Sequence, residues 1–148
     1  MSPTEKRRIL FICTHNSARS QMAEGFVKTL YPDSYEVFSS GIEPSHVNPY
    51  VIKVMTELGI DISGQCAKNV NEFLDRKIDY VVTVCDQAQA TCPFFPGGKT
   101  YIHKSLQDPS VFQGTEEEIL EQVRKVRDEI KDWIEKTFNP RIKIDMTE

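Results

Sequence analysis

The sequence predicts an α/β fold in which helices cover both faces of a parallel β-sheet. Short runs of β-branched and aromatic residues alternate along the chain with longer helical patterns. This alternation is typical of parallel sheets, because a helix must carry the chain back to the edge where the next strand begins. The 148 residues show no internal repeat or linker, so we expect one domain over 1–148 with an ordered core at about 8–138.

The first half of the chain carries two strand patterns, each followed by a helical pattern. RILFIC is a mostly apolar run of the kind found in buried strands. Gly59 can end the second helix, since glycine is common directly after a helix. In chain order we predict a strand at 8–13, a helix at 17–31, a strand at 35–39, a loop at 43–49 and a helix at 51–58.

The second half contains two further strand patterns and the clearest helix of the sequence. Thr115 and Glu118 have the spacing of a capping box, which marks a helix start. The apolar stripe behind them predicts core packing and consists of Ile119, Val123, Val126, Ile130, Trp133 and Ile134. The other predicted elements are a short helix at 71–75, a strand at 79–84, a weaker strand at 100–103 and a polar tail from residue 139.

The composition is that of an ordinary soluble protein. Apolar residues make up 39% and charged residues 27% of the chain, and the net charge of −4 offers no broad attraction to nucleic acid or anionic lipid. No targeting segment is visible, and no stretch approaches the ~20 apolar residues of a membrane span, so we expect a cytoplasmic protein. Its four cysteines are too few for a secreted disulfide framework and are expected to be catalytic, metal-binding or buried.

The segment between the first strand and the first helix predicts an oxyanion-binding loop. Cys13 leaves the strand, five residues follow, and Arg19 stands in the first helical turn. Such a loop can turn its backbone N–H groups toward one anion, and an arginine can add a bidentate contact. The same surroundings favour a nucleophilic thiolate at Cys13, with Ser20 as a further donor. The predicted oxyanion-binding residues are Thr14, His15, Asn16, Ser17, Ala18, Arg19 and Ser20.

This loop and four further segments carry a family resemblance. CTHNSARSQMAEG (13–25) resembles the active-site segment of the low-molecular-weight tyrosine phosphatase superfamily and, within it, of the thioredoxin-coupled arsenate reductases. The resemblance covers about residues 8–138 and includes SSGIEP, VVTVCDQA, CPFFP and Asp108-Pro109. It implies a three-layer fold with a four-stranded parallel sheet flanked by helices. It also implies that Cys13 is the nucleophile, Arg19 the oxyanion clamp and Asp108 the general acid.

Two further cysteines lie near the predicted strand at 79–84. Cys85 ends that strand, at the same sheet edge as Cys13, and Cys92 follows after the helical stretch DQAQAT. An intact helix would separate Cys85 and Cys92 by a rise of about 10.5 Å, whereas a disulfide needs Cα atoms within about 7 Å. A disulfide between them therefore requires this segment to bend or unwind.

The resemblance implies that the chain reduces arsenate to arsenite by a relay of three thiols. Cys13 would attack arsenate, and Asp108 would protonate the departing oxygen. Cys85 would then release arsenite and form a disulfide with Cys13, after which Cys92 would displace Cys13. Thioredoxin would reduce the resulting disulfide. We expect a monomer that needs no metal or organic cofactor and binds phosphate or sulfate as mimics of arsenate.

Other functions remain open. A low-molecular-weight protein tyrosine phosphatase would use Cys13, Arg19 and Asp108 but neither later cysteine, although the region beside the loop offers no obvious aromatic pair to grip a phenyl ring. A non-enzymatic binder of arsenite or metal would give the loop no role. Taken singly, Cys13 could also be a buried strand-end thiol, and Asp-Pro is a common turn dipeptide.

Metal sites are not expected. Some reductases of the resembling family bind potassium, and Asn16, Glu24 and Ser39 match three of its ligand positions, but Lys68 stands at the fourth. The Lys68 ammonium could occupy the place of the ion, so we predict no dependence on potassium. Cys66 is interpreted as a spare, partly buried thiol, and a zinc site that includes it would lack the close paired spacing of structural ligands. His15, His46 and His103 are expected at the surface or in packing.

Overall fold

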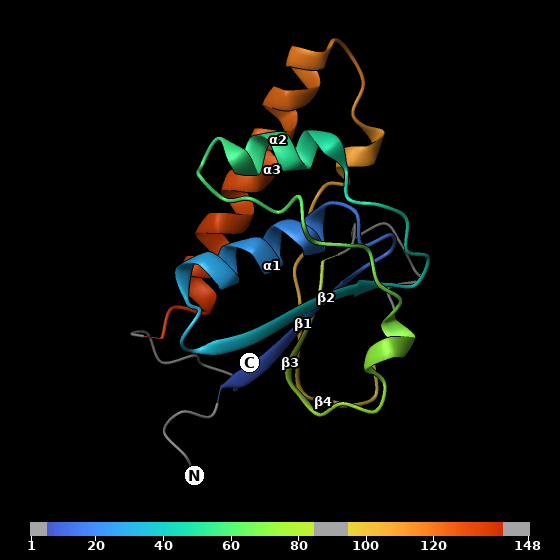
Figure 1. Ribbon diagram of the computed structural model, residues 1–148, viewed down its shortest axis with the longest axis vertical. Helices are drawn as coiled ribbons and strands as arrows, with labels where there is room; N and C mark the ends of the chain where they lie inside the picture. The colour runs from blue at the N-terminus through green and yellow to red at the C-terminus, as the bar shows by residue number, and fades with distance from the viewer. Residues whose placement is uncertain (1–5, 85–94, 141–148) are drawn as a thin grey trace.

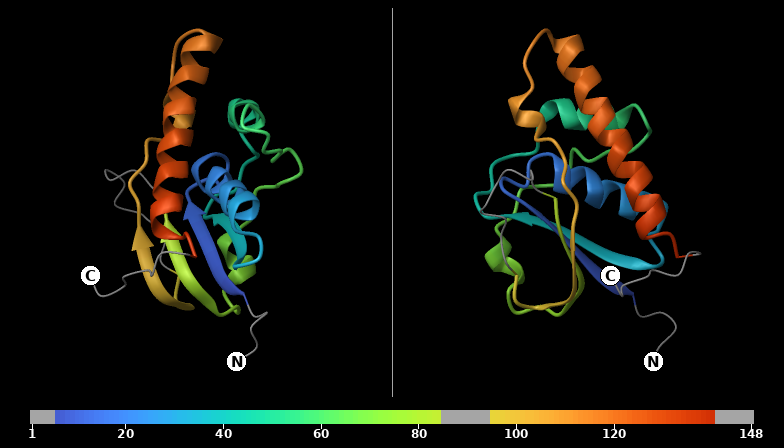
Figure 2. Two further views of the ribbon diagram at one scale, coloured as in Figure 1. Left: turned by 90° about the vertical axis from the view of Figure 1, so that its left-hand side faces the viewer. Right: turned by 180° about the vertical axis from the view of Figure 1, so that it is seen from behind.

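The computed structural model describes residues 6–84 and 95–140 and contains a four-stranded parallel sheet packed against α-helices (Figure 1). The strands lie in the order β2-β1-β3-β4, and their carboxyl ends share one edge (Figure 2). The strands are β1 (Arg7–Cys13), β2 (Tyr35–Gly41), β3 (Ile78–Thr83) and β4 (Gly98–His103). The helical elements are α1 (Arg19–Leu30), α2 (Pro49–Thr56), α3 (Glu116–Thr137) and the 3₁₀-helices η1 (Val70–Phe73) and η2 (Pro109–Val111).

Each face of the sheet has a hydrophobic core. Because successive side chains of a strand point to opposite faces, Ile9 and Phe11 of β1 pack with α1 and α3, whereas Leu10 and Ile12 pack with η1. Helical elements thus cover both faces, which confirms the predicted three-layer α/β fold. α2 lies against α3 (Figure 2). Within the two described ranges, no helix is long and apolar enough to cross a membrane.

The strand order places a topological switch at β1. β2 pairs with one side of β1 and β3 with the other, both in parallel. In open parallel sheets, ligands bind outside the carboxyl ends of the strands next to such a switch. Cys13 is the last residue of β1, so the predicted oxyanion loop starts at this position.

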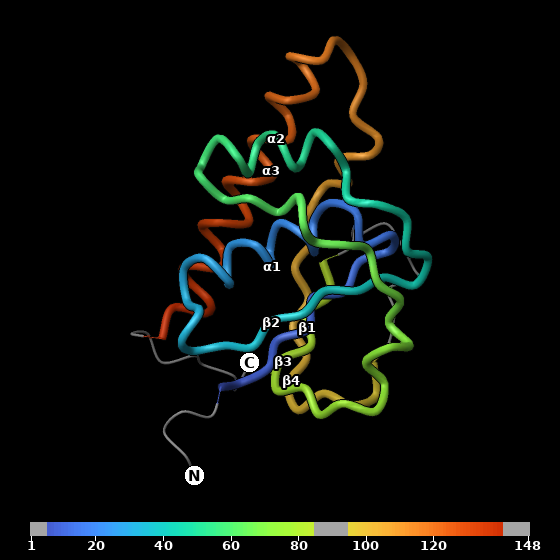
Figure 3. The backbone as a smooth tube through the Cα atoms, in the orientation of Figure 1, coloured from blue at the N-terminus to red at the C-terminus, as the bar shows by residue number. Residues whose placement is uncertain are grey.

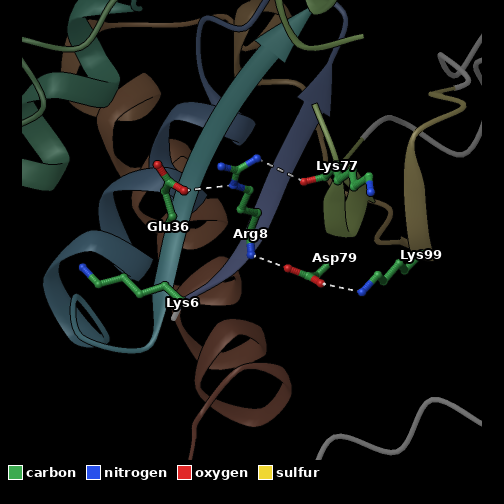
Figure 4. Close-up of a pocket in the computed structure, with 6 residues that line it drawn as sticks. All are labelled: Lys6, Arg8, Glu36, Lys77, Asp79 and Lys99. Carbon is green, nitrogen blue, oxygen red and sulfur yellow. Dashed lines mark hydrogen bonds and ion pairs between the residues drawn. The ribbon is translucent and has the colours of Figure 1, made fainter. Parts of the chain in front are cut away.

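The opposite edge of the sheet carries a charged hollow of about 550 Å³ (Figure 4). Arg8 donates its backbone N–H to Asp79 at 2.8 Å and its Nε–H to Glu36 at 3.0 Å, and Lys99 Nζ lies 3.6 Å from Asp79. Each of these carboxylates faces a cation from a neighbouring strand. The cluster therefore ties the amino ends of the strands together, and it contains none of the predicted site residues.

Two element ends differ from the sequence-based expectation next to the loop. β2 continues beyond residue 39 to Gly41, because its pairing with β1 runs to the partners Cys13 and Gly41. α1 begins at Arg19 rather than at residue 17, with Ala18 as its N-cap. Both shifts have one cause, since residues 13–18 form a tight loop that rests on the end of β2.

The remaining helix boundaries follow capping chemistry. α2 begins at Pro49, two residues earlier than predicted, because the Asn48 side chain caps it. α2 ends at Thr56, two residues before the predicted end, and a turn at 57–59 follows, in which Gly59 has φ +77°, a conformation that glycine adopts without strain. The capping box of Thr115 and Glu118 starts α3, as predicted.

Candidate active site

The predicted oxyanion loop lies between β1 and α1, next to two segments that are distant in the sequence, 43–48 and 65–68 (Figure 3). Its outward carbonyl groups accept hydrogen bonds from the 43–48 segment. The pairs are Thr14 with the amide of Glu43 at 2.9 Å, His15 with that of Ser45 at 3.1 Å, and Ser17 with that of Asn48 at 2.8 Å.

These bonds fix the direction of the loop amides. The described peptide bonds are trans, so the N–H of each peptide unit points opposite to its C=O. Carbonyls of Thr14, His15 and Ser17 that face outward therefore turn the next N–H groups, those of His15, Asn16 and Ala18, toward the inside of the loop. The Asn16 N–H does point inward, at 3.2 Å from Cys13 Sγ. At least three amides of the loop thus face its interior, which is the arrangement of a backbone nest.

The sulfur of Cys13 is buried and contacts two donors. One is the Asn16 backbone N–H, and the other is the Ser20 hydroxyl, whose oxygen lies 2.9 Å from Sγ. The Asn16 side-chain Nδ2 donates to that same hydroxyl oxygen at 2.8 Å. Because Ser20 accepts from Asn16, its own hydrogen remains for the sulfur. Both contacts stabilise negative charge on Cys13.

Close packing against β2 holds the loop in place. Asn16 has φ +50°, a left-handed conformation that asparagine tolerates better than most residues. A Cβ added to Gly41 would lie 2.7 Å from the Thr14 carbonyl oxygen and 2.8 Å from Asn16 N. Gly41 is therefore required by the close approach of the two backbones.

Arg19 and Asp108 meet at the loop. Arg19 Nη1 donates to the Leu106 carbonyl at 3.2 Å, and Nη2 lies 3.6 Å from Asp108 Oδ2. The Arg19 side chain is 3% exposed, and its Nε finds no hydrogen-bond partner among the described residues. A buried cation with an unused donor suits a bound oxyanion. The structure thus brings Cys13, Arg19 and Asp108 together at one end of the sheet.

A buried carboxylate, Glu24, lies behind the loop. It accepts from the Ser39 hydroxyl and from Lys28 Nζ at 2.5 Å. Lys68 Nζ lies 3.9 Å from Glu24 Oε1 and donates to the Cys66 carbonyl at 2.6 Å. Of the three residues matched to a potassium site, Glu24 faces the Lys68 ammonium, Ser39 donates to Glu24, and Asn16 Oδ1 accepts from the Lys68 backbone N–H at 2.8 Å. In this arrangement the ammonium supplies a positive charge beside Glu24.

A hollow of about 240 Å³ opens beside the loop, between Ser17, the 45–50 segment and Ser110. Ser110 belongs to η2, and its backbone N–H donates to Asp108 at 3.0 Å. Among the described residues of the lining, Tyr50 is the one aromatic side chain, and the others are serine, histidine, asparagine and proline. The hollow thus borders the loop at Ser17, and the described part of its lining offers no aromatic pair.

The other cysteines and the histidines singled out in the sequence lie outside the cluster of Cys13, Arg19 and Asp108 or outside the described residues. Cys66 is exposed, not partly buried as expected, because residues 63–66 run along the surface as an irregular segment. His15, His46 and His103 are exposed, as predicted. No group of three or more metal-ligating side chains occurs within residues 6–84 and 95–140. Cys85 and Cys92, with the helix expected between them, lie outside the described residues.

Sequence reasoning missed the residues that support the loop from behind. Gln21 is fully buried, and its side chain contacts loop and neighbouring backbone. Gln65 in turn contacts Gln21. A glutamine in a helical segment is only a weak signal of such a role, because polar residues are also common on the solvent-exposed faces of helices.

Comparison with known proteins agrees with this geometry. The chain matches the family described as low molecular weight phosphotyrosine protein phosphatase over residues 8–145. It is 47% identical to an arsenate reductase of Halalkalibacterium halodurans over 133 residues, which cover 90% of this chain and 95% of that protein.

Solved structures are similar as well. One is an arsenate reductase in the phosphate-binding state, with a TM-score of 0.76 and 36% identity over 88% of this chain and 95% of that chain. Another is the thioredoxin-dependent arsenate reductase of Corynebacterium glutamicum, with a TM-score of 0.62 and 29% identity over 90% of this chain and 64% of that chain. The chain therefore belongs to the low molecular weight phosphotyrosine protein phosphatase family, and it is similar to members of that family named arsenate reductase.

Proposed function

We propose that this chain reduces arsenate to arsenite, with Cys13 as the nucleophile. The observation that carries the proposal is the loop itself, where a sulfur with two donors stands at the end of β1 near a buried arginine with an unused N–H. Arsenate is a tetrahedral oxyanion and fits a ring of N–H donors closed by a bidentate guanidinium. The identity to relatives named arsenate reductase supports this substrate over other oxyanions.

In the first step, the Cys13 thiolate attacks arsenic, so that an arsenic–sulfur bond forms and an arsenic–oxygen bond breaks. Asp108 donates the proton with which the oxygen leaves as water. Arg19 would hold two of the remaining oxygens, and the inward N–H groups of His15, Asn16 and Ala18 would share the rest of the negative charge, with Thr14, Ser17 and Ser20 as the other residues of the loop. The proximity of Asp108 Oδ2 to Arg19 Nη2, 3.6 Å, supports a common target for the acid and the clamp.

In the second step, the Cys85 thiolate attacks the Cys13 sulfur. A disulfide forms, and the electron pair of the arsenic–sulfur bond stays on arsenic, which is reduced by two electrons and leaves as arsenite. Val84, which directly precedes Cys85 in the chain, donates its amide to the Ile12 carbonyl at 2.9 Å, one residue before Cys13. This bond supports an approach of Cys85 from the end of β3.

In the third step, Cys92 attacks Cys85, which releases Cys13 as a thiolate and leaves a Cys85–Cys92 disulfide. Thioredoxin would then reduce this disulfide by exchange, as the thioredoxin dependence of the Corynebacterium glutamicum relative suggests. Since all three thiols must be reduced before each turnover, we infer that the chain works in the cytoplasm. Cys13, Arg19 and Asp108 come from one chain, so we also infer a single domain over 1–148 that acts as a monomer.

A phosphatase side activity is expected from the same loop, because phosphate shares the shape and charge of arsenate. It would use Cys13, Arg19 and Asp108 and would proceed through a phosphocysteine. The polar hollow beside the loop, in which Tyr50 is the one aromatic side chain among the described residues, favours a weak activity toward aryl phosphates.

The test is arsenate-dependent oxidation of NADPH by the chain in the presence of thioredoxin and thioredoxin reductase. We expect turnover with arsenate and competitive inhibition by phosphate, which would occupy the same loop. Omission of thioredoxin should stop turnover. No NADPH oxidation with arsenate, although the protein binds phosphate, would reject arsenate reduction while leaving the oxyanion loop intact.

A further inference from the structure

A pair of glutamines braces the Cys13 loop from behind. The Gln21 side chain is fully buried, and its Nε2 donates to the Asn16 carbonyl at 2.9 Å and to the Cys66 carbonyl at 3.0 Å. Its Oε1 accepts from Gln65 Nε2 at 2.6 Å. Every polar atom of the Gln21 side chain is thus used to join the loop to the 65–68 segment.

The chemistry of the contacts fixes the orientation of both amides. Backbone carbonyls accept and cannot donate, so the Gln21 atom near the Asn16 and Cys66 carbonyls must be the nitrogen. Gln65 Nε2 also lies 3.2 Å from the Gln21 carbonyl, which fixes Gln65 in the same way. The order of dependence is therefore clear: Gln65 holds Gln21, and Gln21 holds Asn16.

Asn16 is the residue through which this brace reaches the sulfur. It has φ +50°, and all its polar groups are engaged. Its backbone N–H points at Cys13 Sγ, its Nδ2 donates to Ser20, and its Oδ1 accepts from the Lys68 backbone N–H at 2.8 Å. The carbonyl of Asn16, bound by Gln21, completes the set. A rotation of Asn16 would displace both donors of the sulfur at once.

We propose that Gln21 is a positioning residue for the nucleophile, which holds Asn16 in the conformation that presents donors to Cys13 and to a bound oxyanion. Gln65 acts through Gln21. This inference rests on the proposed role of Cys13. A loop that already has its binding conformation does not spend binding free energy on becoming ordered. The two glutamines therefore strengthen oxyanion binding and stabilise negative charge on the Cys13 sulfur.

The test uses Gln21→Met, which keeps the length of the side chain and removes its hydrogen bonds, together with Gln65→Met and the double variant. Gln122→Met is the matched control, because the Gln122 amide donates to the Glu118 carbonyl within α3, far along the chain from the loop. Phosphate affinity is measured by calorimetry. The formation of the Cys13 thiolate is followed with pH by its ultraviolet absorbance, in a background where the other three cysteines are serine.

Gln21→Met should weaken phosphate binding on the order of tenfold and move thiolate formation to higher pH. Gln65→Met should give a smaller change in the same direction, and the double variant should match Gln21→Met, because Gln65 acts only through Gln21. The charged groups around the loop, Arg19 with Asp108 and Glu24 with Lys68, are the same in all variants. A shift in the thiolate titration therefore reports geometry.

A purely structural role would give a different result. Gln21→Met would then lower the unfolding temperature, while phosphate affinity and the thiolate titration stayed at the values of Gln122→Met. Additive effects in the double variant would also contradict the proposal. If Gln21→Met fails to fold, Gln65→Met decides, and unchanged phosphate affinity there would overturn the brace. Neither readout needs arsenate turnover, so a failure of the brace is distinct from a failure of the proposed reaction.

Discussion

Arg19 Nη2 lies 3.6 Å from Asp108 Oδ2, while Nη1 of the same guanidinium donates to the Leu106 carbonyl at 3.2 Å. One short backbone segment, 106–108, therefore positions both the clamp and the acid. The η2 turn fixes Asp108 further, because its Oδ1 accepts the Ser110 N–H at 3.0 Å. The Asp108 carboxylate is thus oriented by the Ser110 N–H at one oxygen and by the Arg19 guanidinium at the other.

Asp108→Asn tests the acid role. Asparagine also caps helix starts, so the bond to Ser110 should survive, whereas the transferable proton is lost. We expect aryl phosphatase turnover to fall about 10²–10⁴-fold, with phosphate affinity nearly unchanged. Arsenate turnover should fall as well, because the oxygen that leaves arsenate needs the same proton to depart as water. The control is Asp132→Asn on α3, and equal phosphatase turnover in Asp108→Asn and the control would rule out the acid role.

Arg19→Lys tests the clamp. Lysine keeps the positive charge but cannot offer two parallel N–H groups, and it cannot keep the contacts to Leu106 and Asp108 together. We expect phosphate affinity to drop about tenfold or more by calorimetry. Arg124→Lys, at an exposed cluster with Glu57 and Glu117, should leave it unchanged. Phosphate binding that is equally tight in both variants would place the oxyanion elsewhere.

Replacement of potassium tests the role of Lys68. Its ammonium lies 3.9 Å from Glu24 and 2.6 Å from the Cys66 carbonyl oxygen, where it supplies a positive charge next to a buried carboxylate. Turnover should therefore stay constant when potassium chloride is exchanged for choline chloride at equal ionic strength. Lys68→Ala should lower turnover and make it respond to potassium. Wild-type turnover that depends on potassium would contradict the prediction.

Tyr35→Phe tests the anchor of α3. The Tyr35 hydroxyl donates to the Phe138 carbonyl at 2.8 Å, and burial, with the nearby Tyr80 hydroxyl, raises the pKa of Tyr35 from 10.0 to about 12. The folded state thus disfavours the phenolate, so stability is lost as pH rises from about 10 toward 12. At neutral pH, urea unfolding should show the variant to be about 1 kcal/mol less stable than wild type. As the pH rises from about 10 toward 12, the variant should lose less further stability than wild type. Equal alkaline losses would refute this account.

The order of the strands and helices could be predicted from the sequence because each element carries its own signal. The capping box of Thr115 and Glu118 and the apolar run of β1 are examples, and both are confirmed. The end of β2 could not be predicted. Gly41 is typical of a turn in the sequence, but the position requires glycine because an added Cβ would lie 2.7 Å from the Thr14 carbonyl oxygen of the loop. This close approach becomes visible only when β2 is paired with β1 up to Gly41.

The candidate site, like the fold, could be predicted from the sequence only in part. The proximity of Cys13 and Arg19 follows from a motif at a sheet edge, whereas the place of Asp108 beside them followed from the family resemblance. The support of the loop by Gln21 and Gln65 could not be predicted, because it depends on a contact between residues 44 positions apart. Long-range hydrogen bonds of neutral side chains leave no periodic pattern, so they emerge only from the folded chain.

The most direct measurement compares arsenate reduction with aryl phosphate hydrolysis in three single variants, Cys13→Ser, Cys85→Ser and Cys92→Ser. The reductase assay contains thioredoxin, its reductase and NADPH, and Cys66→Ser is the matched control because Cys66 is an exposed thiol. The relay predicts that repeated arsenate turnover disappears in all three variants, whereas phosphate hydrolysis disappears only in Cys13→Ser. Sustained arsenate turnover in Cys85→Ser, at the rate of the Cys66→Ser control, would contradict the relay.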